Sequence, residues 1–365
     1  MKFFVDGKEM MAGVLSVIKA LPIRSSMPVL DGILVEARAQ EIHLVCSDLM
    51  FQKECTIPAE VVSEGGCVVK GKFFAELLRK LPDGEIEFDL EGMILKMNCG
   101  RVRQRIQCIE YDEFPLMRTK GESYEIRMEP SACHDMIEQT VFAVSQDDSR
   151  PVLTGTLIEV QDDTVSMVAT DSFQFAMTTL HCKQSVTDKS TIVQGKVLSE
   201  IAKMAEESEE EEIVLQLTQT HISVEVNRSR LTARLLDGKY LDYKRIMPKE
   251  CKSRVLVETA QLYEIIDRAQ LMSREGNNSI ILQFEEQQLT IRAESHLGRT
   301  EDTIEVQIVG DGFEIAFNPK YCLNVLKNIS DEKIYMEFNT PISPCLIRPV
   351  QGDRYLYLIV PMRIF

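Results

Sequence analysis

Alternating and helical patterns of hydrophobic residues recur in the same order three times along the chain. Each copy opens on a short alternating run that predicts a strand, at 2–5, 124–128 and 254–257. Apolar residues at helical spacing follow, as at Val14, Ile18 and Leu21 in the first copy. They predict helices over about 7–20, 130–144 and 259–272.

Further period-two alternation predicts strand pairs beyond each first helix. The clearest runs lie at 85–90 with 93–97, 158–160 with 165–169, 213–217 with 221–226, and 333–338. Two helices against a mostly antiparallel sheet in each copy predict an α+β fold. The linkers are expected at 115–123 and 248–253, which divides the chain into domains 1–122, 123–250 and 251–365.

A direct sequence repeat supports this division. The segment 26–36 matches 149–159 at an offset of 123, with seven of the eleven positions identical. The third copy has diverged here, where 278–282 replaces the Pro-Val-Leu strand. Each copy is the size of a domain, so the repeat predicts three homologous domains in tandem.

Composition places the chain among ordinary globular proteins of the cytoplasm. It is 44% hydrophobic and 27% charged, and no apolar run is long enough to cross a membrane. The first six residues include Lys2 and Asp6, which does not suit a secretory signal. Ten cysteines are scattered without paired spacing and are expected as reduced thiols.

Basic residues recur at the start and end of the second helix predicted in each copy. The lysines at 72, 196 and 320 are 124 residues apart, and a second base follows seven positions after each. Seven residues are almost two helical turns, so both bases share one face. Because the net charge is −16, recurring basic faces suggest a polyanion, contacted non-specifically through phosphates. The candidate residues for this contact are Arg24, Lys72, Arg79, Lys196, Lys203, Arg274, Lys320 and Lys327.

Enzyme motifs are absent from the sequence. It has no phosphate-binding glycine loop, nucleophile elbow or paired Cys-x-x-Cys, and its five histidines are isolated. We therefore expect no catalytic residue, metal or cofactor. The recurring acids Asp48, Asp171 and Glu294 are better explained as caps of turns than as catalytic carboxylates. The acidic run 206–212 is expected to be a solvated loop.

Several motifs, in order, give the chain a family resemblance over its whole length. They include Lys72-Phe73-Phe74 and the segments 148–155, 168–172, 236–240 and 360–363. The chain resembles the bacterial sliding clamp, the β subunit of DNA polymerase III. The resemblance implies a non-catalytic, head-to-tail homodimer that closes into a ring of six domains, with helices inside and sheets outside. Such a ring encircles duplex DNA and tethers the replicative polymerase.

The resemblance also implies a pocket for partner peptides between the second and third domains. Its expected partners are the polymerase III catalytic subunit, the clamp loader and other clamp-motif proteins. Carried over by position, the pocket residues are Arg150, Val152, Leu153, Thr170, Phe175, Leu241, Arg245, Ile246, Leu358, Val360, Pro361 and Met362. The implied dimer interface places Gln104 opposite Leu271 and Met272.

The chain departs from the family pattern in this pocket. Phe173-Gln174-Phe175 stands where the family usually has His-Arg-Leu, and Leu241 stands where it usually has proline. A lost cation and two added phenyl rings predict a bulkier, less polar rim and an altered peptide preference. Gln104 also replaces an apolar residue that is common at the dimer seam.

Two alternatives stay open at this stage. One is a clamp-like paralogue that serves mainly as a protein-binding scaffold with altered partners. The other is a cytosolic α+β enzyme that draws an acidic or phosphorylated substrate along the basic faces. Two observations weigh against the enzyme. The sequence shows no pair of a nucleophile and a base, and the basic face recurs in all three domains, whereas an active site would be expected in one.

Overall fold

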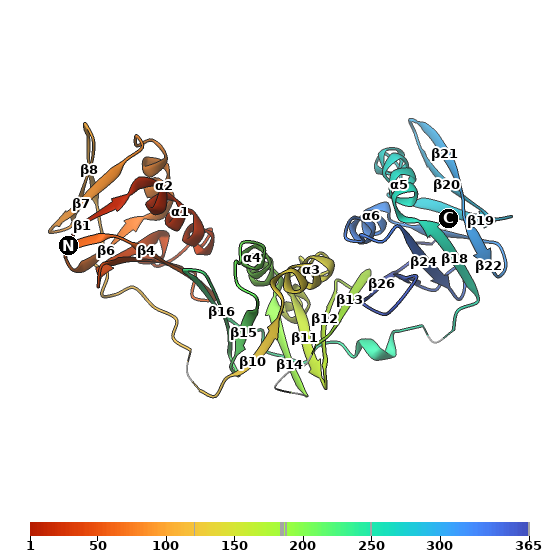
Figure 1. The fold of residues 1–365 in the computed structure, drawn as a ribbon. Coiled ribbons are helices and arrows are strands. Elements are labelled where there is room, and N and C mark those ends of the chain that lie inside the picture. Colours follow the sequence, from red (N-terminus) through yellow and green to blue (C-terminus); the bar gives the residue numbers. More distant parts are fainter. Residues whose placement is uncertain (120, 183–185, 187, 249, 364–365) are drawn as a thin grey trace. The chain divides into compact units, whose positions relative to one another are not determined.

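The computed structural model describes residues 1–119, 121–182, 186, 188–248 and 250–363. The chain forms two compact units, coloured by sequence in Figure 1. Unit 1 comprises Met1–Pro130 and Met204–Leu235, and unit 2 comprises Ser131–Lys203 and Leu236–Phe365. Each unit is described by itself.

Unit 1 holds two sheets and the helices α1 (Gly7–Val17) and α2 (Gly71–Arg79). The first sheet has the order β5 (Glu60–Ser63), β1 (Lys2–Asp6), β7 (Glu85–Glu91), β8 (Ile94–Cys99) and β9 (Val102–Gln107). The second has the order β10 (Tyr124–Met128), β15 (Ile213–Leu217), β16 (His221–Val226), β17 (Ser229–Arg234), β4 (Phe51–Pro58), β3 (Glu41–Ser47), β2 (Gly32–Arg38) and β6 (Gly65–Lys70).

Unit 2 also holds two sheets, together with α5 (Thr259–Arg274), α6 (Pro319–Lys327) and most of α3 (Pro130–Val141) and α4 (Gly195–Glu206). The larger sheet has the order β14 (Lys189–Gln194), β11 (Gly155–Gln161), β12 (Thr164–Thr170), β13 (Gln174–His181), β26 (Tyr355–Ile359), β25 (Cys345–Pro349), β24 (Lys333–Phe338), β18 (Ser253–Glu258) and β22 (Gln307–Val309). The smaller has the order β21 (Gly298–Glu305), β20 (Gln288–Ser295), β19 (Ile280–Glu285) and β23 (Phe313–Phe317).

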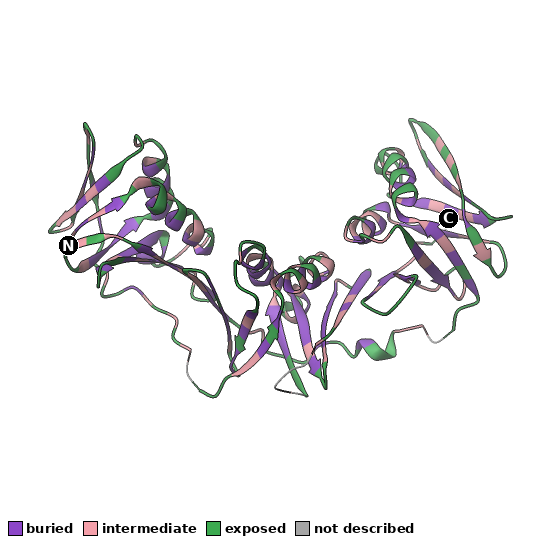
Figure 2. Cartoon of the chain, viewed as in Figure 1, coloured by how far each residue is buried: buried purple, intermediate pink, exposed green. Residues whose placement is uncertain are grey.

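Amphipathic patterns explain why the helices lie against the sheets. In α2 the side chains of Phe74, Ala75 and Leu78 are buried at helical spacing, while Lys72 and Arg79 are exposed. Strand β1 alternates, with Phe3 and Val5 buried. Figure 2 shows the same division, with exposed residues along the helices on the side away from the sheets. The cores therefore lie between helices and sheets.

The sequence repeat forms one structural device twice. A 3₁₀ turn, η2 (Pro28–Asp31) or η3 (Pro151–Thr154), leads directly into β2 or β11. Both strands begin with a glycine at a crowded site. A Cβ on Gly32 would lie 2.3 Å from Val68 Cγ1, and one on Gly155 would lie 2.7 Å from Leu236 Cδ1. The close packing at the start of these strands explains the repeated glycine.

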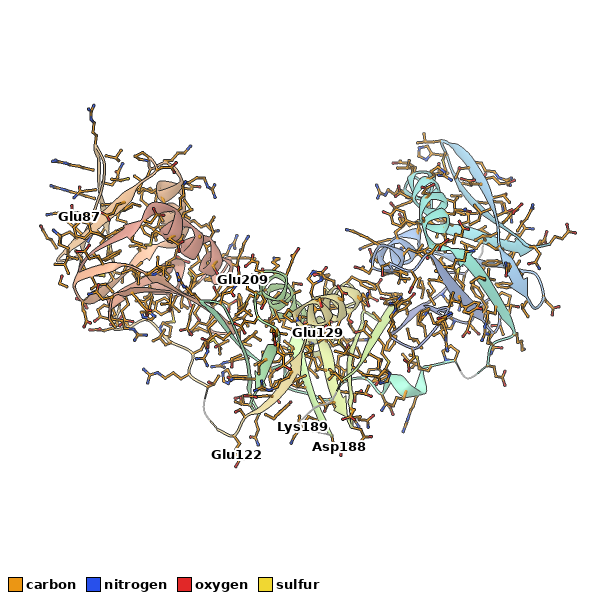
Figure 3. All side chains as sticks on the ribbon, in the orientation of Figure 1. Glu87, Glu122, Glu129, Asp188, Lys189 and Glu209 are labelled. Atoms are coloured by element: carbon orange, nitrogen blue, oxygen red, sulfur yellow. The ribbon has the colours of Figure 1, made fainter. Side chains whose placement is uncertain are left out.

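The described strand pairs are all antiparallel, which confirms the α+β prediction. Two helices end earlier than predicted. Helix α1, predicted to reach 20, changes at Ile18 to a 3₁₀ turn, η1 (Ile18–Ala20), and α3, predicted to reach 144, ends at Val141. Helix α5 instead runs two residues further, to Arg274. The acidic run is a loop from Glu207 on, whereas Glu206 is the last residue of α4; Figure 3 labels Glu209 on this loop.

Sheet pairing divides the middle repeat between the two units. Strand β17 pairs with β4 in unit 1, and β13 pairs with β26 in unit 2, so each large sheet contains strands from two repeats. This continuity was not foreseen from the sequence. The domain boundaries after 122 and 250 stay a prediction.

Candidate functional site

The recurring bases lie at equivalent places on three helices. Helices α2, α4 and α6 begin at 71, 195 and 319, so the first lysine is the second residue of each helix. The second base is the ninth residue of each. All six side chains are exposed: Lys72, Arg79, Lys196, Lys203, Lys320 and Lys327.

Helix electrostatics distinguish the two positions. A base in the last turn is favoured by the negative end of the helix dipole, and Lys203 also bonds Glu200 Oε1 at 2.7 Å. A lysine in the first turn meets the positive end, which disfavours it by about 0.3–1 kcal/mol. The second bases therefore have an ordinary structural explanation. The first lysines oppose the helix dipole, so their recurrence is the stronger sign of a bound anion.

The other two candidate DNA contacts are also exposed. Arg24 lies in the segment between η1 and η2. Arg274 is the last residue of α5, and its Nη2 donates to Gln270 Oε1 at 2.7 Å. Both side chains can therefore reach a polyanion from the surface of their own unit.

Two of the three recurring acids cap turns, as predicted. Asp48 Oδ1 accepts from the backbone N–H groups of Met50 and Phe51 at 2.9 and 2.7 Å. Asp171 Oδ1 accepts from those of Phe173 and Gln174, both at 2.9 Å. Glu294 differs, because it lies within β20 opposite Arg299, and the prediction of a turn cap is wrong there.

The described residues contain no group of three or more His, Cys, Asp or Glu side chains that could hold a metal ion. Their helices include none long and apolar enough to cross a membrane.

Unit 2 gathers many of the predicted pocket residues into one apolar cluster, here called the pocket floor. Its buried members are Leu153, Leu157, Val168, Phe175, Ile192, Tyr240, Tyr243, Leu346 and Leu358. Val152 and Val360 pack against it with their side chains partly buried. Leu153 comes from η3, Phe175 from β13 and Leu358 from β26, so segments far apart in the sequence build one surface.

Other predicted pocket residues in unit 2 do not belong to the pocket floor. Leu241 and Ile246 are 44% and 43% exposed, and Arg150 is exposed. Arg245 Nε pairs with Asp242 Oδ2 at 2.8 Å. Pro361 and Met362 are partly buried, and the Met362 N–H donates to the Ala316 carbonyl at 2.7 Å.

Thr170 has a structural role. It is 2% exposed, and its Oγ1 donates to the Gln174 carbonyl at 2.7 Å, which closes the turn between β12 and β13. Its hydroxyl is therefore committed to the backbone of that turn.

The two phenylalanines of the departing segment have different environments. Phe175 is 1% exposed and packs on Tyr243, with ring centroids 5.7 Å apart, so the expectation that it lies at the rim is wrong. Phe173 is 57% exposed and stacks on Tyr321 of α6, with centroids 5.9 Å apart and ring planes 11° apart. Only Phe173 adds an exposed ring.

Gln174, between these rings, is a buried polar residue whose structural role the sequence did not predict. It is 4% exposed, and its Nε2 donates to the Phe142 carbonyl at 3.3 Å and to Asp171 Oδ2 at 3.1 Å. Its Oε1 accepts from Asn324 Nδ2 of α6 at 3.4 Å. Gln174 thus ties β13 to α6. Its substitution for the family's arginine was the signal that marked the position.

The predicted dimer residues lie on or beside edge elements. Gln104 is exposed on β9, an edge strand of its sheet. Leu271 on α5 is 67% exposed, whereas Met272 is partly buried and its Sδ accepts from Ser295 Oγ at 2.9 Å. Leu271 is therefore the more available of the two for a partner.

Repeated helix-and-sheet elements, in which α2, α4 and α6 each begin with an exposed lysine at the second position, fit a DNA-clamp type of protein. Three family models match the chain in order: the N-terminal domain of the DNA polymerase III beta subunit over 1–118, the central domain over 127–242 and the C-terminal domain over 244–363.

Several similar proteins are named beta sliding clamp. The beta sliding clamp of Halalkalibacterium halodurans is 30% identical over 381 residues and all of both chains, and that of Bacillus subtilis is 28% identical over the same span. Solved clamps superpose closely, with full coverage of both chains. The B. subtilis structure has a TM-score of 0.95 at 28% identity, and the Pseudomonas aeruginosa clamp bound to griselimycin has 0.93 at 27%.

The chain belongs to the DNA polymerase III beta subunit family, the bacterial sliding clamps. Its function is therefore that of a DNA sliding clamp, a non-catalytic processivity factor in replication. The scaffold-only and enzyme alternatives are not favoured.

Proposed function

We propose that two copies of the chain join head to tail into a ring around duplex DNA. Partner proteins bind to this ring through short peptide segments. The division into domains 1–122, 123–250 and 251–365 belongs to this proposal, as does a cytoplasmic location. The observation that carries it is the lysine at the second position of α2, α4 and α6, where the helix dipole disfavours a base.

Charge on two edge strands supports head-to-tail closure. Strand β9 and the residue before it carry the exposed bases Arg101, Arg103 and Arg105. Strand β21, an edge of the smaller sheet in unit 2, carries one base, Arg299, and three acids, Glu301, Asp302 and Glu305. Edge strands have unpaired backbone groups, and opposite charge favours their pairing between two copies. The exposed Leu271 adds apolar area on the same unit as β21.

DNA contacts in such a ring need only be weak. The basic residues reach phosphates rather than base edges, so binding depends on salt and not on sequence. A closed ring keeps its hold on DNA by topology, which leaves it free to slide. The acidic balance of the whole chain, with a net charge of −16, keeps non-specific adhesion low.

The pocket floor supports docking of a peptide with large apolar side chains. Leu153, Phe175 and Leu358 form its buried base, and the exposed Leu241 and Ile246 lie on the same unit. Recognition of this kind depends on a few apolar anchors with polar groups around them.

Topological retention tests the proposal. The full chain is loaded on a nicked circular plasmid with a bacterial clamp loader and ATP, then passed through a sizing column at high salt. We expect the protein to stay with the circle and to leave once the plasmid is linearised. Equal loss from both forms, or equal retention, would contradict the ring.

A further inference from the structure

A stacked ring pair, of which Phe173 is exposed and Tyr321 is partly buried, lies beside the pocket floor in unit 2. The Phe173 and Tyr321 rings are nearly parallel, yet Phe173 remains 57% exposed. Tyr321 therefore covers only part of the Phe173 ring, and more than half of the residue's surface is open to solvent. Phe175, two residues further along the chain, belongs to the pocket floor, which places the open ring next to that surface.

Backbone contacts hold Phe173 in place before any partner binds. Its N–H donates to Asp171 Oδ1 at 2.9 Å, and its carbonyl accepts from the N–H of Val360 at 2.9 Å. Ser172 adopts a φ of +80°, and its N–H donates to Thr170 Oγ1 at 3.1 Å. The turn is thus fixed to both the sheet and the C-terminal segment. A fixed ring loses little conformational entropy on binding.

The ring pair also lies within reach of a negative charge. The carboxylate of Asp171 caps the turn that carries Phe173. Burial raises the pKa of Tyr321, and the charge of Asp171 raises it further. The family usually has histidine at 173, a side chain that can carry positive charge beside such a carboxylate. Phenylalanine leaves the carboxylate without that cation and adds a ring face.

We propose that Phe173, Tyr321 and Asp171 form a subsite for a guanidinium or ammonium group of the partner peptide. The occupant is therefore a segment with an arginine or lysine beside its large apolar residues. A cation over an aromatic face gains from the ring quadrupole, and the nearby carboxylate adds to that gain. This inference rests on the proposed peptide pocket and narrows its partner class.

A matched peptide scan tests the subsite. Fluorescein-labelled hexapeptides of sequence Ser-Ser-Ser-Ser-Leu-Phe carry arginine, citrulline or phenylalanine at one serine position at a time. Citrulline has nearly the shape of arginine without its charge. In titrations of the full chain followed by fluorescence anisotropy, we expect arginine to bind about five-fold more tightly than citrulline at one position.

Two variants test whether the Phe173 ring and the Asp171 charge cause that preference. Phe173→Leu removes the ring, and Asp171→Asn removes the charge while it keeps an oxygen for the turn cap. Both should reduce the preference for arginine over citrulline to less than about two-fold. Asp48→Asn, at the equivalent turn cap in unit 1, is the control and should change neither affinity.

Three results would overturn the subsite. They are equal binding of arginine and citrulline at every position, a preference that survives Phe173→Leu, and tighter binding of phenylalanine than of arginine at the preferred position. The last result would mean that the ring pair takes an aromatic side chain. Failure of every peptide to bind would instead reject the proposed pocket, and the subsite with it.

Discussion

Single residues fix the junction between β13 and α6. Gln174 is buried with both ends of its amide engaged, toward Phe142 and Asp171 on one side and Asn324 on the other. A buried amide with all its hydrogen bonds formed stabilises one packing of β13 against α6. A buried polar group that loses its hydrogen-bond partner is destabilising, because it has given up its bonds to water and gained none in exchange. The residue that replaces the family's arginine is therefore structural, and its neighbour Phe173 provides the exposed ring.

Gln174→Ala should lower the free energy of unfolding by about 1–3 kcal/mol, because Asn324 and the Phe142 carbonyl lose a buried partner. Urea denaturation followed by circular dichroism measures the change. Gln261→Ala is the control, since Gln261 is exposed and bonds only the side chain of Glu258. Equal effects of the two substitutions would show that the Gln174 network contributes nothing.

At the scale of elements, three helices carry a charge at an unfavourable end. The lysines that open α2, α4 and α6 oppose the helix dipole, yet the sequence keeps them at a spacing of 124 residues. The bases near the ends of the same helices are stabilising. If these bases contact DNA as proposed, helix stability disfavours the first lysines that DNA binding requires, whereas both favour the second bases.

The triple variant Lys72→Glu, Lys196→Glu, Lys320→Glu should bind DNA much more weakly while its helices remain at least as stable. Acidic side chains suit helix starts, so each helix should gain about 0.3–1 kcal/mol. The slope of log affinity against log salt should flatten by about one unit for each phosphate that the protein no longer neutralises. Fluorescence anisotropy with labelled duplex DNA measures both affinity and slope.

The control for that variant is Lys239→Glu, Lys252→Glu, Lys333→Glu, which makes the same change in net charge at exposed positions outside the three helices. If the two triple variants bind DNA with equally reduced affinity, total charge and not the helix starts governs binding.

At the scale of the whole molecule, the proposed head-to-tail ring depends on two unpaired sheet edges. Strands β9 and β21 end their sheets with opposite charge and open backbone groups. A chain that carries both edges suits a head-to-tail ring, because each copy supplies one edge to the next. The same arrangement would leave a monomer with two exposed edges.

Arg103→Glu with Arg105→Glu should weaken dimerisation at least about ten-fold through like-charge contacts across the seam. Adding Glu301→Arg and Glu305→Arg to the same chain should restore much of the loss. Sedimentation velocity over a concentration series gives the dimer dissociation constant. Arg118→Glu with Arg228→Glu, both outside β9, is the control. Failure of the second pair of substitutions to rescue the first would argue against β9–β21 pairing.

Local patterns in the sequence determined the three copies, their α+β class, the positions of the six bases and the turn caps at Asp48 and Asp171. These features depend on neighbours a few residues away, so periodicity and offset are sufficient to find them. The prediction failed at Glu294, where the third copy has an ordinary strand residue paired with Arg299.

Only the tertiary structure decided which strands join across the repeats and which phenyl ring stays exposed. Pairing of β17 with β4 and of β13 with β26 uses backbone hydrogen bonds between segments far apart in sequence, and these bonds leave no side-chain pattern to read. Phe173 precedes β13, on a turn beside Tyr321, whereas Phe175 lies within the strand and packs on Tyr243. The sequence placed both rings near one pocket, but packing against distant residues determined that Phe175 is buried and Phe173 is not.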